Sequence, residues 1–101
     1  MSISVIEVPN SVTVRSVTDF GQHLTTALAG HDEIVLDIEA MDELDLSFIQ
    51  LVHAARGEEG KTVRLARPAN AAVAALLDRA GFLTDPSDAD RDFWFHGDLP
   101  R

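Results

Sequence analysis

The stretch "IVLDIEAMDELDLSFIQLVHAAR", residues 34–56, joins a strand, a short loop and a helix in immediate succession. Its first five residues form a nearly continuous apolar run, typical of a central strand or of one covered on both faces. The helical pattern opens after Asp45. Four apolar side chains then fall on one side of that helix: Phe48, Leu51, Val52 and Ala55.

The segment after this helix, "TVRLA" (62–66), alternates between polar and apolar residues, as a strand does. Strand, helix and strand with these lengths form a βαβ crossover. The two strands are therefore expected to be parallel and adjacent or nearly so.

Two further segments flank this unit on the N-terminal side. "ISVIEV" (3–8) and "SVTVRSV" (11–17) are rich in β-branched residues, and Pro9-Asn10 between them is a turn signal. This pattern predicts a β-hairpin. Apolar residues at helical spacing follow and end at Gly30: Phe20, Leu24, Ala27 and Leu28.

On the C-terminal side, Pro68 and Asn70 announce another helix, which Gly81 ends as a C′ residue. Its apolar stripe is Val73, Leu76, Leu77 and Ala80. Beyond Phe82 the chain is acidic and irregular until "DFWFH" (92–96), which contains the single tryptophan. We expect Phe93, Trp94 and Phe95 to fold back and cover the sheet or a helix; if exposed, they would form a second docking patch.

The predicted fold class is therefore α/β: a small mixed β-sheet of about four strands. It includes an N-terminal hairpin, βαβ crossovers and three or more helices. The length of 101 residues predicts one domain, with a core over residues 3–83 and an acidic, aromatic tail over 84–101.

Composition restricts the functional classes. The net charge of −9 disfavours binding to nucleic acid or anionic lipid, because phosphate contacts require Lys and Arg. There is no cysteine, so disulfides and thiolate metal sites are excluded. The N-terminus has no signal-peptide pattern, and no apolar run has the length of a membrane span. A cytoplasmic location is expected.

The start of the 46–56 helix carries the candidate functional residues. Asp45 is a good N-cap, since its carboxylate can accept hydrogen bonds from the first helical amides. Leu46, Gln50 and His53 fall on the side away from the predicted core, and Ser47 lies on the flank. An isolated exposed leucine is common and needs no function.

The order of these elements resembles a STAS domain over residues 3–83. "LDLSFIQLVHAAR" (44–56) resembles the family's D-S-[SA]-G-[ILV] helix start, and "LLDRAGF" (76–82) resembles its closing L-x-x-x-G-[LF] motif. The family includes bacterial anti-sigma factor antagonists, cytoplasmic tails of sulfate transporters and small signalling proteins. The resemblance implies a non-enzymatic protein-interaction module that requires no cofactor.

In the antagonists, the serine after the motif aspartate is phosphorylated by a kinase-like anti-sigma factor, which breaks the complex. Here Asp45 matches the aspartate, but Leu46 replaces the phosphoacceptor and Phe48 replaces the glycine. The resemblance therefore implies a partner surface formed by Asp45, Leu46, Gln50 and His53 without the usual switch. The implied partner is an anti-sigma factor or a chemotaxis-type histidine-kinase component.

Two alternatives remain within this resemblance. The chain could be a soluble accessory subunit that docks on the ATPase of an ABC-type membrane transporter. It could also be a true phosphoprotein that uses Ser47, which matches the family's second small residue.

Catalytic and metal sites are weakly indicated. Four carboxylates between residues 37 and 45 superficially resemble a receiver-domain site: Asp37, Asp42, Glu43 and Asp45. They could attract a divalent cation. The favoured interpretation is that they are solvated loop and cap residues. The four histidines lack ligand spacing: His23, His31, His53 and His96. Ser47 has no nucleophile-elbow motif, so no catalytic residue is assigned.

Overall fold

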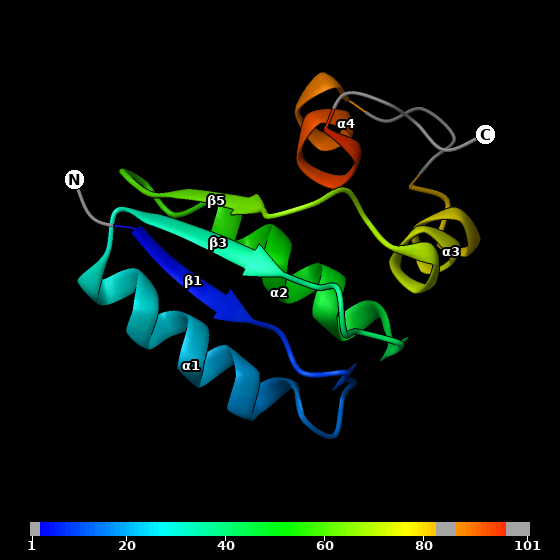
Figure 1. The fold of residues 1–101 in the computed structure, drawn as a ribbon, viewed down its shortest axis with the longest axis horizontal. Helices are drawn as coiled ribbons and strands as arrows, with labels where there is room; N and C mark the ends of the chain where they lie inside the picture. The colour runs from blue at the N-terminus through cyan, green and yellow to red at the C-terminus, as the bar shows by residue number, and fades with distance from the viewer. Residues whose placement is uncertain (1–2, 83–86, 97–101) are drawn as a thin grey trace.

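Strand β3 (Glu33–Asp37) is the centre of a three-stranded parallel sheet, flanked by β1 (Ile3–Glu7) and β5 (Thr62–Leu65) (Figure 1). The computed structural model describes residues 3–82 and 87–96. On one face of β3, Ile34 and Leu36 are fully buried. This burial explains the apolar run at the start of the 34–56 stretch.

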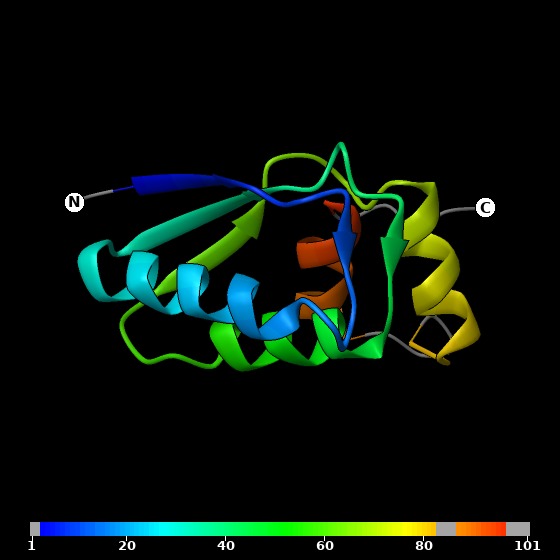
Figure 2. The same ribbon diagram turned by 90° about the horizontal axis from the view of Figure 1, so that it is seen from below.

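Helices α1 (Val17–Gly30) and α2 (Leu46–Arg56) lie on the same face of this sheet (Figure 2). They contact each other through the rings of Phe20 and Phe48, whose centroids are 6.0 Å apart. Helix α2 connects β3 to β5, and these strands are adjacent and parallel. The α/β class and the predicted crossover are confirmed.

The predicted N-terminal hairpin is wrong, and so is the mixed sheet that it implied. β1 pairs in parallel with β3, whereas the short β2 (Ser11–Val12) pairs in parallel with β4 (Glu43–Leu44) in a second, two-stranded sheet. The segment that follows β1 stays paired with β3 as far as Val8, whose N–H donates to Asp37 O at 2.8 Å. It then separates from β3. The carbonyl of Asn10 then accepts from the amides of residues 42 and 43 at 2.9 and 3.0 Å. The turn at 9–10 therefore moves the chain from one sheet to the other.

Helix α3 (Ala71–Arg79) follows directly after its N-cap, Asn70, and confirms the helix that Pro68 and Asn70 announced. The Asn70 side chain accepts from Val73 N at 2.9 Å and donates to the carbonyls of Ile38 and Met41 at 2.9 and 2.8 Å. It therefore caps the helix and also ties it to the loop after β3. Gly81 has φ +85°, which confirms its predicted role as a left-handed C′ residue. Within the predicted apolar stripe, Ala80 is exposed as the C-cap.

The end of the chain is partly helical, which corrects the prediction of an irregular tail. Helix α4 (Asp88–Phe95) is capped by Ser87, whose Oγ accepts from Asp90 N at 3.1 Å. The predicted folding back of the aromatic cluster is confirmed: Phe93, Trp94 and Phe95 are 5–7% exposed and join the hydrophobic core. The core therefore includes residues beyond the 3–83 segment.

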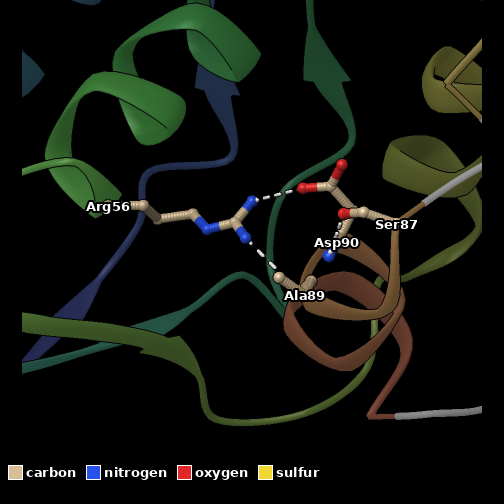
Figure 3. A network of polar contacts seen from close by, with 4 residues as sticks. All are labelled: Arg56, Ser87, Ala89 and Asp90. Atoms are coloured by element: carbon tan, nitrogen blue, oxygen red, sulfur yellow. Dashed lines mark hydrogen bonds and ion pairs between the residues drawn. The ribbon is translucent and has the colours of Figure 1, made fainter.

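Arg56, at the end of α2, attaches α4 to the rest of the protein (Figure 3). Its guanidinium lies 2.9 Å from the Asp90 carboxylate, donates to the Ala89 carbonyl at 3.4 Å and sits 4.4 Å from the centroid of the Phe93 ring. The arginine side chain is 19% exposed, so solvent screens these contacts less than those of a fully exposed pair.

Replacement of this arginine should loosen α4. We expect Arg56→Ala to lower the free energy of unfolding by about 1–2 kcal/mol, because it removes a partly buried ion pair and a cation–π contact. Denaturant titration followed by Trp94 fluorescence measures this loss. The matched control is Arg67→Ala, whose ion pair with Glu39 has a similar length of 3.0 Å but is 66% and 62% exposed. Equal losses in the two variants would contradict a special role for Arg56.

Candidate functional site

The start of α2 is organised by the Asp45 carboxylate. Asp45 has an extended backbone and is the N-cap of the helix. Its Oδ1 accepts from the backbone amide of Ser47 at 3.0 Å and also from the Ser47 hydroxyl. These contacts satisfy one of the free amides of the first turn and place negative charge at the positive end of the helix. The capping role predicted for Asp45 is confirmed.

The second carboxylate oxygen reaches another part of the chain. Asp45 Oδ2 accepts from the backbone amide of Val14 at 2.9 Å, in the turn between β2 and α1. The pairing of β2 with β4 supports the same junction, as does the hydrogen bond from Ser11 Oγ to Glu43 Oε1 at 2.5 Å. One side chain therefore fixes the start of α2 against a turn that lies 31 residues earlier.

Two apolar side chains are exposed beside this junction. Leu46, the first residue of α2, is 41% exposed, and Val14 is 70% exposed. The backbone of Val14 is held by the same carboxylate that caps the helix of Leu46. Sequence reasoning identified Leu46 and missed Val14, because "SVTVRSV" indicated a strand and contains no signal for a turn beside a distant helix.

The helix faces are largely as predicted. Leu46, Gln50 and His53 are exposed and lie three or four residues apart, which places them on one side of α2. On the inner side, Phe48, Val52 and Ala55 are buried and Leu51 is half-buried, as expected. Ile49 is also buried, which the predicted stripe omitted.

Ser47 is half-buried, and its hydroxyl belongs to the cap. A phosphate on this oxygen would remove the donor to Asp45 and place a dianion against a carboxylate. Phosphorylation of Ser47 would therefore have to displace the cap. The Ser47 hydroxyl therefore differs from a phosphoacceptor hydroxyl that projects freely into solvent.

Three of the four carboxylates considered for a cation have other partners. Asp37 accepts from Glu39 N at 3.0 Å, Glu43 accepts from Ser11, and Asp45 accepts from Val14 and Ser47. Across residues 3–82 and 87–96, no group of three or more His, Asp and Glu side chains is placed to hold a metal ion. Of the histidines, His96 hydrogen-bonds through Nε2 to the Leu65 carbonyl at 3.2 Å.

The hydrogen bonds around Asp45 lower the pKa of its carboxyl below the ordinary value of 3.8. The Ser47 hydroxyl contributes most, followed by the Val14 amide, while burial opposes the shift and the Ser47 amide adds to it. The carboxylate is therefore charged at neutral pH and fully able to accept these hydrogen bonds.

A comparison with protein families agrees with this arrangement. A family model described as "Mlab, STAS domain" matches residues 2–84. The chain belongs to the STAS family. STAS domains are generally binding modules for protein partners rather than enzymes. Searches of curated proteins and of solved structures found no match to this chain. Among the residues that the structure describes, no helix is both long and apolar enough to cross a membrane.

The depressed pKa predicts a pH-dependent contribution of Asp45 to the stability of this STAS domain. Because the folded-state pKa lies below the unfolded one, the stabilisation is present above the unfolded value of 3.8 and is lost as the pH falls through the folded value. Asp45→Asn should therefore be less stable than the wild type near neutral pH. That difference should shrink in acid.

Denaturant titrations at a series of pH values measure this difference. Asp42→Asn is the control, since Asp42 is exposed and its side chain makes no hydrogen bond within the described part of the chain. A wild-type advantage over Asp45→Asn that stays constant down to the lowest pH would contradict the role of the carboxylate charge.

Proposed function

We propose that this STAS protein is a non-enzymatic docking module of bacterial signal transduction that works in the cytoplasm. Its partner is a kinase-like anti-sigma factor or a chemotaxis-type histidine-kinase component. The contact surface is the start of α2, formed by Asp45, Leu46, Gln50 and His53. Support comes from membership of the family, together with the exposure of the last three side chains on one side of a firmly capped helix.

The observation that carries this proposal is the position of Leu46. A leucine at the first position of a helix could have turned inward, yet 41% of this one is exposed beside the exposed Val14. The Asp45 hydrogen bonds hold both segments in place before any partner binds. A preorganised apolar contact costs little conformational entropy on binding, which is the property of an interface anchor.

The charge of the protein defines the complementary surface. With a net charge of −9, the chain favours a partner whose apolar pocket is bordered by Lys and Arg. Electrostatic attraction of this kind mainly accelerates association and should weaken at high salt.

The proposed docking does not depend on the usual serine switch. Leu46 stands where the resembled antagonists carry the phosphoacceptor, and a leucine side chain cannot accept phosphate. The neighbouring Ser47 hydroxyl is bonded to Asp45. Binding is therefore constitutive or regulated through the partner rather than through phosphorylation at this helix start.

A pull-down from the native bacterium with mass spectrometry identifies the partner. Recovery of a kinase-like protein supports the proposal. Recovery of a transporter ATPase would replace it with the accessory-subunit alternative, and phosphate on Ser47 of the recovered chain would replace it with the phospho-switch alternative.

Titration of the recovered kinase-like protein with purified variants then tests the surface. Leu46→Asp should weaken binding at least tenfold, which corresponds to about 1.4 kcal/mol, because it places a charge in an apolar contact. The matched control is Phe82→Asp, since Phe82 is 42% exposed and follows α3. Far-UV circular dichroism verifies that both variants are folded. Unchanged affinity in Leu46→Asp would reject this surface.

A further inference from the structure

Strand β1 presents apolar side chains on the face of the sheet that α1 and α2 leave open. Ile3 is 50% exposed and Val5 is 64% exposed, while Ile6 on the alternate side is buried in the core. In the parallel register, Val5 lies beside Val35 of β3. These three side chains, Ile3, Val5 and Val35, therefore share the outer face of the sheet.

The backbone of β1 also has an available edge. Val8 N–H points toward β3, where it donates to Asp37 O at 2.8 Å. Because backbone groups alternate in direction along a strand, those of Ile3, Val5 and Glu7 point away from β3. Among residues 3–82 and 87–96, no strand pairs with this side of β1.

Exposed edge strands are normally protected by lysine, proline or a bulge, because their free N–H and C=O groups can pair with another chain. The β1 sequence, Ile-Ser-Val-Ile-Glu, contains neither lysine nor proline. Its only charge, Glu7, stands at the end of the strand. The middle of β1 therefore carries no lysine or proline that would prevent it from pairing with a strand of another chain.

We infer that β1 is an interface between two copies of this chain, paired as antiparallel edge strands around a two-fold axis at Val5. In this register Val5 lies opposite the partner's Val5, and Ile3 lies opposite the partner's Glu7. The backbone groups that point outward from β1 are those that such a pairing uses, with each of these opposed pairs exchanging both of its N–H···O bonds. Opposed β-branched residues are favourable cross-strand neighbours.

A second copy fits this edge for two reasons. A two-fold interface requires a self-complementary surface, and β1 places an apolar residue on the axis with its hydrogen-bonding groups turned outward. The antiparallel register also places the two Glu7 carboxylates at opposite ends of the pair.

The pairing surface is short, and two chains of charge −9 repel each other. The dimer is therefore weak and strengthened by salt.

This interface is independent of the docking surface proposed above. β1 forms one edge of the main sheet, whereas the start of α2 follows β4 of the second sheet, beyond the carboxyl end of β1 (Figure 1). A dimer would therefore carry two separate α2 starts.

Sedimentation velocity of the untagged chain tests the inference over micromolar to millimolar concentrations and at two salt concentrations. The wild type should form a concentration-dependent dimer that added salt strengthens. Val5→Lys should weaken dimerisation at least tenfold, because it brings two like charges together on the axis. The matched control is Val14→Lys, since Val14 is 70% exposed outside β1 and this variant should dimerise as the wild type does.

Amide hydrogen exchange provides a residue-level readout that separates this interface from other association. The amides of Val5 and Glu7 should become more protected as the protein concentration rises, whereas that of Ile6, which points toward β3, should be protected at all concentrations. A monomeric wild type at the highest concentration would overturn the inference. So would a dimer that persists in Val5→Lys or that leaves the Val5 amide unprotected.

Discussion

The central position of β3 is the constraint on which the rest of the fold depends. This strand pairs in parallel on both sides, so each neighbour has to be reached through a crossover. Helices α1 and α2 are those crossovers, and both lie on the face where Ile34 and Leu36 are fully buried. The carboxyl ends of β1 and β3 then lead into the loops that form the second sheet, β2–β4, immediately before the capped start of α2.

The Asp45 carboxylate converts this topology into a defined surface. One of its oxygens holds the first turn of α2 and the other holds the turn at Val14. Two exposed apolar residues from segments far apart in the chain, Val14 and Leu46, therefore lie beside one junction. A helix cap usually makes only local contacts, but the Asp45 cap also makes a long-range hydrogen bond to Val14.

The local patterns of the sequence predicted much of this structure. Apolar periodicity indicated α2 and its inner face, Asn70 and Gly81 marked the limits of α3, and Asp45 was recognisable as a cap. The hairpin failed because β-branched residues around Pro9 indicate strands and a turn but not the strand that β1 pairs with. Helix α4 was missed because it has only eight residues and many of them are acidic.

The sequence by itself determined the elements whose causes are local: the α/β class, the capped start of α2 and the outward direction of Leu46. Tertiary structure alone decided that β1 pairs with β3, that Val14 adjoins the start of α2, and that Arg56 holds α4 in place. The physical reason is that caps and apolar periodicity act over a few residues. Strand pairing and long-range hydrogen bonds depend instead on how the whole chain buries its apolar faces.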